Sequence, residues 1–179
     1  YKNRIAMEGC VERSVDRLWP SQNFSQTPYW AFRDDDLYRE EGERLFRGPH
    51  WNYLCVEAEI PEAGDYVVGY VGETQVVINR LEDGGIAAFI NSCAHRGAQL
   101  VRNLRGRSLS HTCAYHQWCF DLDGTLLGVP QQRGVKGCGG MPKDFDKAAH
   151  GLQRLRVTSY KGLVFGTFSA ETVPFQDYV

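Results

Sequence analysis

The sequence lacks the features that mark several classes of protein. Its 179 residues contain no apolar run near the roughly 20 residues that a membrane-spanning helix needs. Charge of one sign is not in excess either, because 20 Lys and Arg are interleaved with 22 Asp and Glu, and the net charge is −2. A protein that binds nucleic acid usually carries a basic stripe, and none is visible. We therefore expect no membrane span and no nucleic-acid partner.

Cysteine is present but is not arranged as in a domain stapled by disulfides. The six cysteines are scattered at positions 10, 55, 93, 113, 119 and 138 of a chain that is long for such a scaffold. The chain begins at Tyr1 without a charged segment followed by an apolar stretch, so nothing marks export. These observations predict metal binding inside the cell and a cytoplasmic location.

The first part of the chain lacks the strand-like pattern of the rest. Residues 1–33 show no sustained period of 2 or 3.6 and are interpreted as an extended arm. Residues 34–47 open with three Asp, carry sparse apolar positions and stop at Gly48-Pro49, which predicts one short amphipathic helix. Three acids at a helix N-terminus solvate the helix end, so we interpret them structurally and not as a metal site.

After His50 the sequence is typical of short strands. Apolar and β-branched runs separated by Gly-bearing turns predict a β-sandwich or small barrel. The runs cover residues 51–56, 65–71, 74–79, 86–91, 117–126 and 152–168. Asp123-Gly124, with Leu residues on both sides, predicts a hairpin. Residues 129–151 are rich in Gly and Lys, lack the phosphate-binding patterns G-x-x-x-x-G-K-S/T and G-x-G-x-x-G, and are interpreted as an ordered covering loop.

Two Cys-plus-His pairs are the chemically informative feature. C-A-H-R-G starts at Cys93, and C-A-Y-H-Q-W starts at Cys113. In one interpretation, Cys93, His95, Cys113 and His116 form a tetrahedral zinc site, but zinc sites usually group like ligands as C-x₂₋₄-C and H-x₃₋₅-H. In the other, the two thiolates bind one iron of a [2Fe–2S] cluster and the two imidazoles bind the other, which is Rieske ligation. Alternating unlike ligands favour the Rieske interpretation, because each loop then supplies one ligand to each iron.

With these motifs, residues from about Thr27 to Val179 resemble the alpha, or large, subunit of Rieske non-haem iron ring-hydroxylating oxygenases. The stretches that carry the resemblance are residues 45–54, 91–98, 113–126, 133–145, 149–152 and 163–168. The sequence most resembles the group that acts on anthranilate, benzoate, salicylate and terephthalate. One departure is Ala114, where the family often has Pro, which leaves that loop less rigid with ligation unaffected.

The resemblance implies a mainly β fold, a Rieske [2Fe–2S] β-sandwich over residues 49–168. It implies an N-terminal arm and helix over residues 1–48 that would pack on a catalytic domain, and the start of a linker over residues 169–179. It also implies cluster ligation by Cys93, His95, Cys113 and His116, with Arg96 and Gly97 in the first loop and Trp118 beside the second.

The implied function is electron transfer within an aromatic ring-hydroxylating dioxygenase. Electrons would come from an NADH-dependent reductase or a ferredoxin and pass to a mononuclear Fe(II), where dioxygen is used to hydroxylate an aromatic substrate. The resembled group implies that this substrate is an aromatic carboxylate. The family also implies a homotrimer of alpha subunits, with or without beta subunits.

No candidate for the mononuclear iron site is visible in the sequence. Such a site needs two His and one carboxylate, and only His50, His111 and His150 remain, none at a suitable spacing. We therefore expect this chain alone to transfer electrons without hydroxylating. We interpret His111 as a satisfied structural histidine and His150 as a packing or interface residue. The alternative is a free-standing Rieske ferredoxin that only carries electrons, and a zinc-stapled interaction domain is the third hypothesis.

The other four cysteines are not interpreted as reactive groups. They are read as small buried hydrophobes or incidental free thiols. The four are Cys10, Cys55, Cys119 and Cys138.

Overall fold

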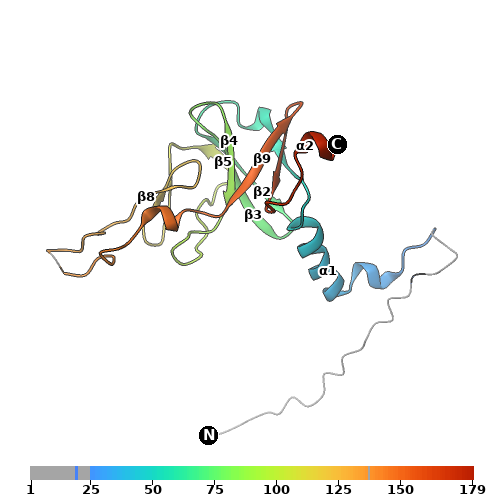
Figure 1. Ribbon diagram of the computed structural model, residues 1–179, viewed down its shortest axis with the longest axis horizontal. Coiled ribbons are helices and arrows are strands. Elements are labelled where there is room, and N and C mark those ends of the chain that lie inside the picture. The colour runs from blue at the N-terminus through green and yellow to red at the C-terminus, as the bar shows by residue number, and fades with distance from the viewer. Residues whose placement is uncertain (1–18, 20–24, 137) are drawn as a thin grey trace, which may run out of the picture. The chain divides into compact units, whose positions relative to one another are not determined.

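The computed structural model of the chain describes residue 19 and residues 25–136 and 138–179 (Figure 1). Contacts divide the chain into two compact units, one over residues 1–41 and one over residues 42–179. Both candidate ligand loops belong to the second unit. No helix among the described residues is long and apolar enough to cross a membrane.

The first unit contains the predicted helix. A 3-10 helix, η1 (Tyr29–Phe32), precedes helix α1 (Asp35–Glu41). Asp34 caps α1, because its Oδ1 accepts the backbone N–H groups of Asp36 and Leu37, each at 3.0 Å. The helix prediction is therefore confirmed for this stretch. Most of the predicted extended arm lies outside the described residues, and its described part at η1 is helical, so the arm prediction is wrong there.

The backbone changes its hydrogen-bonding pattern at the start of the second unit. Residues predicted to continue the helix form η2 (Gly42–Phe46), a single π-helical stretch. Its Gly42 carbonyl accepts the N–H of Arg47 at 3.0 Å, five residues on. One continuous α-helix to Arg47 is thus wrong, and the α-helical part ends at Glu41.

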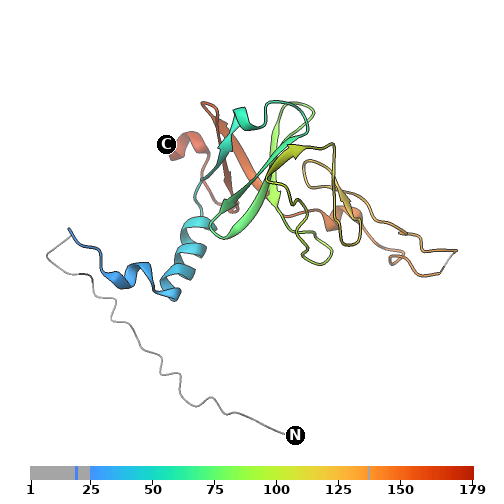
Figure 2. The same ribbon diagram turned by 180° about the vertical axis from the view of Figure 1, so that it is seen from behind.

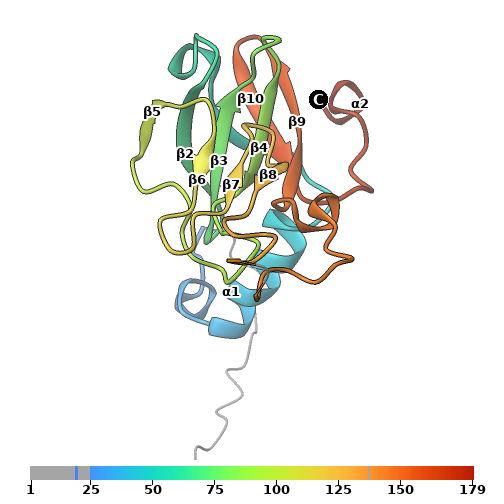
Figure 3. The same ribbon diagram turned by 90° about the vertical axis from the view of Figure 1, so that its left-hand side faces the viewer.

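The second unit consists of two antiparallel sheets (Figures 1 and 3). The larger sheet has the strand order β1-β10-β9-β4-β3-β2-β5 and the smaller has the order β6-β7-β8. The strands of the larger sheet are β1 (Asn52–Val56), β2 (Asp65–Val71), β3 (Thr74–Arg80), β4 (Ile86–Ile90), β5 (Arg105–Arg107), β9 (Arg154–Tyr160) and β10 (Leu163–Thr167). The smaller sheet contains β6 (His111–Thr112), β7 (Cys119–Phe120) and β8 (Leu126–Gly128).

Short helical turns complete the unit. They are η3 (Glu57–Glu59), η4 (Lys147–His150) and α2 (Phe175–Tyr178). Phe175 of α2 is buried, and its ring packs on those of Trp51 and Phe165 at centroid distances of 5.8 and 4.5 Å. The C-terminal segment is thereby packed on the larger sheet through one aromatic side chain.

The larger sheet curls on itself and separates two cores. A Cβ added to Gly69 of β2 would lie 3.3 Å from the carbonyl oxygen of Leu54 in β1, so these strands approach closely although they are not hydrogen-bonded neighbours. One core fills the inside of the curl and contains Val76 and Ile78 of β3. The other lies against the smaller sheet and contains Val77. Alternation along β3 therefore sends successive side chains to different cores.

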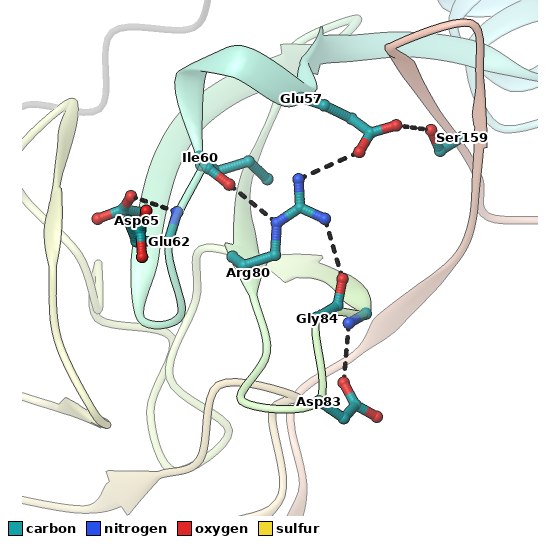
Figure 4. Close-up of polar contacts among 9 residues, drawn as sticks. Glu57, Ile60, Glu62, Asp65, Arg80, Asp83, Gly84 and Ser159 are labelled. Carbon is teal, nitrogen blue, oxygen red and sulfur yellow. Dashed lines mark hydrogen bonds and ion pairs between the residues drawn. The ribbon is translucent and has the colours of Figure 1, made fainter.

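Arg80, the last residue of β3, fixes this end of the strand. Its Nε donates to the Ile60 carbonyl at 2.9 Å, and its Nη1 donates to the Gly84 carbonyl at 2.9 Å (Figure 4). Its Nη2 lies 3.2 Å from Glu57 Oε2, and the other oxygen of Glu57 accepts the Ser159 hydroxyl. One half-buried guanidinium thus ties β3 to η3 and to the turn after β3, and through Glu57 to Ser159 of β9.

The mainly β prediction is confirmed, and each predicted run contains strand. Strands β5 and β6 were missed because they are three and two residues long, too short for a period. The Asp123-Gly124 hairpin is confirmed, since Gly124 has a φ of +88° and the turn joins β7 to β8.

The predicted covering loop divides into two parts with different environments. Met141 and Phe145 pack against the core beside the smaller sheet. The tip between Gln131 and Gly140 is mostly exposed, and Figures 1 and 2 both show this segment reaching away from the strands. The covering prediction is therefore right for the second half of the loop and wrong for its tip.

Candidate functional site

The first candidate ligand loop is a tight turn that begins at Cys93. The Cys93 N–H donates to the carbonyl of Ala98 at 2.8 Å, and the Cys93 carbonyl accepts the N–H of Gly97 at 2.8 Å. Gly97 has a φ of +70°, the left-handed region where glycine carries no Cβ penalty. The loop backbone is therefore closed on itself, with His95 at its outer end.

The second candidate ligand loop repeats this geometry. The Cys113 N–H donates to the carbonyl of Trp118 at 2.8 Å, and the Cys113 carbonyl accepts the N–H of Gln117 at 2.9 Å. The residue with positive φ is again the fourth after the cysteine, here Gln117 at 58°. Two equivalent turns therefore present one cysteine and one histidine each, a correspondence that unequal C-x-H and C-x-x-H spacings had hidden.

The two cysteines meet on the buried side of the loops. Cys93 is 4% exposed and Cys113 is 1% exposed, and both belong to the core beside the smaller sheet. Burial is the main reason that the pKa of the Cys93 thiol is raised, and Cys113 raises it further, whereas the backbone N–H groups of His95 and Arg96 lower it.

The two histidines meet on the outer side of the same loops. The ring centroids of His95 and His116 lie 4.6 Å apart at an interplanar angle of 72°. Both side chains are half-buried. Burial is the main cause that lowers the pKa of His95, followed by repulsion from His116 and Arg96. The lowered pKa of His95 favours its neutral imidazole, the form in which histidine binds a metal, and the two rings lie close together.

Aromatic side chains flank both imidazoles. Trp118 stacks on His95, with centroids 4.7 Å apart and planes 6° apart. Tyr115 lies on His116 at a centroid distance of 3.7 Å and an angle of 34°. Trp118 is buried in the core whereas Tyr115 is exposed. The two histidines are therefore oriented from different sides, one by the core and one by a surface ring.

These residues fit a two-iron cluster better than a single metal ion. His95 Nδ1 is buried and has no hydrogen-bond partner within the described residues, which is the state expected of a nitrogen whose partner is a metal. No group of three or more His, Cys, Asp or Glu that could hold one metal ion is found in the part of the chain that the structure describes. The donors form a buried sulfur pair and an outer nitrogen pair, the arrangement that Rieske ligation requires.

Comparison with known proteins agrees with this chemistry. A family model for the Rieske [2Fe–2S] domain matches residues 50–139. The chain belongs to this family. It therefore carries a [2Fe–2S] cluster, the fold is that of a Rieske domain, and the zinc-stapled hypothesis is set aside.

The relatives of this Rieske domain are oxygenases. The chain is 55% identical over 164 residues to the anthranilate 1,2-dioxygenase large subunit of Burkholderia cepacia, covering 92% of this chain and 39% of that protein. It is 44% identical over 168 residues to the large oxygenase component of salicylate 5-hydroxylase of Ralstonia sp, covering 92% of this chain and 40% of that protein. The chain thus spans about two fifths of the length of these relatives.

A solved structure shows the same fold. Naphthalene 1,2-dioxygenase from Rhodococcus sp. bound to indole is similar with a TM-score of 0.74 and 36% identity, over 83% of this chain and 32% of that chain. The resemblance to ring-hydroxylating oxygenase alpha subunits, inferred from the motifs, is confirmed by these matches.

Two of the three remaining histidines, His111 and His150, have the structural roles predicted for them. His111 is buried with its Nε2 2.7 Å from Asn79 Oδ1, and burial lowers its pKa to about 4. The ring of His150 packs on Phe145 at 4.5 Å and on Trp118 at 6.0 Å. Neither meets the Cys and His pairs as an additional ligand.

The other cysteines differ in environment. Cys55 is buried, Cys119 is half-buried and Cys138 is exposed, and all three are free. Cys10 lies outside the described residues. The prediction of buried or free thiols agrees with these environments, since Cys55 is buried and Cys119 and Cys138 are free.

Proposed function

We propose that this chain is the Rieske electron-transfer portion of an aromatic ring-hydroxylating dioxygenase alpha subunit, with Cys93 and Cys113 on one iron and His95 and His116 on the other. The observation that carries the proposal is the separation of a buried thiol pair from an outer imidazole pair, in a chain that aligns over 92% of its length with an anthranilate dioxygenase large subunit. The bound cluster supplies reversible one-electron transfer.

The placement of the four side chains defines where electrons cross the surface. Cys93 and Cys113 are enclosed by the core, so the buried pair offers no path to a partner. His95 and His116 are half-buried, and they are the outermost of the four. We propose that electrons arrive and leave through the imidazole edges, while Trp118 and Tyr115 keep these rings in place.

Charge around the loops supports a protein donor with an acidic surface. Over residues 84–143 the only acids are Asp121 and Asp123. The same stretch contains Arg96, Arg102, Arg105, Arg107, Arg133, Lys136 and Lys143. Arg105 and Arg107 pair with Glu59 and Asp65, whereas the other five make no ion pair within the described residues. Of these, Arg96 lies at the site, with its guanidinium carbon 5.7 Å from the centroid of the Tyr115 ring. A basic side chain beside an electron-transfer edge favours encounter with an acidic partner. The net charge of −2 for the whole chain does not reveal this local excess of basic residues.

We propose that the donor is an NADH-dependent reductase or a ferredoxin. The proposal extends to an acceptor, the mononuclear Fe(II) of a catalytic domain, and to an alpha-subunit homotrimer with or without beta subunits. Names of relatives support an aromatic carboxylate substrate, since they include anthranilate, salicylate and terephthalate oxygenases. A cytoplasmic location also belongs to the proposal, supported by the free thiols of Cys55, Cys119 and Cys138.

A chimaera tests the proposed role most directly. The aligned segment of the Burkholderia cepacia large subunit is replaced by this chain, and anthranilate turnover is measured with that enzyme's own electron donor. We expect turnover to persist in the chimaera and to vanish when His116 is replaced by Ala. A chimaera that holds its full iron and sulfide but is inactive would overturn the proposal, and activity restored only by adding the free chain in solution would support the ferredoxin alternative.

A further inference from the structure

Strand β3 carries two polar side chains on the face that looks toward the ligand loops. Gln75 and Asn79 alternate with Val77, which lies in the same core as Cys93 and Cys113. Val76 and Ile78 point to the opposite core. Figure 3 shows β3 between its neighbours in the larger sheet, with the smaller sheet in front of it. The polar face of β3 is therefore the one nearest the site.

Gln75 is joined to the base of the first loop through Asn91. The Asn91 Oδ1 accepts the N–H of Val101 at 2.7 Å, and its Nδ2 donates to the Val101 carbonyl at 2.7 Å. The same Nδ2 donates to Gln75 Oε1 at 2.8 Å, and the Asn91 N–H donates to the Gln75 carbonyl at 2.9 Å. The buried amide of Asn91 thus joins the two ends of residues 91–101, the segment that holds the first ligand loop. Gln75 hydrogen-bonds this amide and so links it to β3.

Asn79 is joined to the base of the second loop through His111. The two side chains are buried, with His111 Nε2 2.7 Å from Asn79 Oδ1. The His111 ring is confined by Tyr66 and Phe89 at centroid distances of 5.3 and 5.8 Å. His111 belongs to β6, which leads directly into Cys113. This contact is a direct side-chain hydrogen bond between the larger and the smaller sheet.

Strand β3 is suited to serve as a common reference for both loops. It is paired on both sides, with β2 and β4, along its length. Its end is fixed by Arg80 and the three acceptors described above (Figure 4). A displacement of one loop relative to the other would therefore require breaking a buried hydrogen bond to β3.

We propose that Gln75 and Asn79 are positioning residues that set the placement of the two cluster-binding loops relative to each other. Each residue acts on one loop, Gln75 through Asn91 and Asn79 through His111. The inference rests on the ligand assignment proposed above, and it adds two residues outside the ligand motifs. Neither touches the candidate ligands, so their effect on the cluster is transmitted by the loop bases.

The first test uses hydrogen–deuterium exchange on the metal-free full chain, which does not depend on the cluster. The variants are Gln75→Leu and Asn79→Leu, and the matched control is Ile78→Val, which loses a methyl group on the opposite face of the same strand. We expect Gln75→Leu to speed exchange about threefold to tenfold over residues 91–101 and Asn79→Leu to do so over residues 111–118, the factor that one net hydrogen bond represents. The control should change neither loop selectively.

The second test measures the electron paramagnetic resonance spectrum and the midpoint potential of the reconstituted, reduced chain. We expect both polar variants to shift the g-values and the potential, and Ile78→Val to leave them unchanged even where its melting temperature falls equally. Wild-type spectra in both variants, or exchange that rises equally in both loops, would overturn the positioning role. A wild-type chain that takes up no iron and sulfide would instead overturn the proposed function, while the exchange pattern would still decide whether β3 holds the loops.

Discussion

The indole of Trp118 lies parallel to the imidazole of His95, with ring centroids 4.7 Å apart and planes 6° apart. Trp118 is itself buried in the core, where Phe145 meets its ring edge-on at 5.9 Å. A half-buried candidate ligand is therefore oriented directly by the core. This contact explains why a large flat side chain follows Gln117, the residue with positive φ in the second loop.

Replacing Trp118 tests this orientation. Trp118→Leu removes the stack and leaves a cavity, so we expect unfolding free energy to fall by roughly 2 kcal/mol or more. The reduced cluster should show broadened electron paramagnetic resonance lines, because His95 samples more orientations. Trp118→Phe retains a flat ring and should keep narrow lines. Equal line widths in the Leu and Phe variants would mean that the stack does not orient His95.

The positive φ of Gln117 gives a second prediction. A β-branched residue is strained in the left-handed region, whereas glycine adopts it freely. We expect Gln117→Val to lower stability by about 1–2 kcal/mol, measured by chemical denaturation, and to reduce iron content. Gln117→Gly should retain the cluster, as Gly97 does in the equivalent turn. Full iron occupancy and unchanged stability in the Val variant would contradict the described backbone.

Thiol reactivity should separate Cys55 from Cys138. Burial, with the nearby Glu59 carboxylate, raises the pKa of Cys55 to about 12, so this thiol stays protonated at neutral and mildly alkaline pH. Cys138 is exposed. We expect iodoacetamide to label Cys138 rapidly and Cys55 only after denaturation, as read by peptide mass spectrometry. Rapid labelling of Cys55 in the folded chain would show that β1 is not packed as described.

Glu57 makes stability depend on pH in a defined direction. Hydrogen bonds from Ser159 and then from Arg80 lower the pKa of the Glu57 carboxyl in the folded chain (Figure 4). Its contribution is therefore fully present above the unfolded value of about 4.3 and is lost as pH falls through the lower folded value. Glu57→Gln should be less stable than wild type at neutral pH.

That difference should shrink at acid pH, as the pH falls through the lowered folded value and the wild-type carboxyl becomes protonated. Urea denaturation at both pH values measures it. Glu62→Gln serves as a control, since Glu62 contributes its backbone N–H and not its carboxylate to the neighbouring Asp65 contact. A pH-independent difference at Glu57 would show that the lost contact is not ionic.

Much of the site could be predicted because its chemistry is local in sequence. Cys93 and His95 are two residues apart, and Cys113 and His116 are three apart, so the donor types are visible without a fold. The division into a sulfur pair and a nitrogen pair follows from the chemistry of iron. Short runs rich in β-branched residues, such as that of β3, likewise predicted strands.

The supporting residues could not be predicted, because their partners are distant in sequence. Asn91 bonds Val101, ten residues away, and His111 bonds Asn79, 32 residues away. The left-handed backbone at Gln117 has no sequence signal, since Gln is not a residue that favours positive φ. The boundaries predicted at residues 48 and 168 remain proposals. The structure divides the chain into two units after Glu41. The sequence gives no sign of this boundary, because the acidic stretch that predicts a helix continues past it.

The account stands on the assignment of Cys93, His95, Cys113 and His116 as cluster ligands, and pulsed electron–nuclear resonance on the dithionite-reduced chain tests it most directly. The chain is labelled with ¹⁵N-histidine, and its iron and acid-labile sulfide are assayed in parallel. We expect two irons and two sulfides per chain, a rhombic signal and couplings to two histidine nitrogens, all lost in Cys93→Ser and kept in Cys138→Ser. One zinc per chain without sulfide, or a cluster signal without histidine nitrogen coupling, would contradict the account.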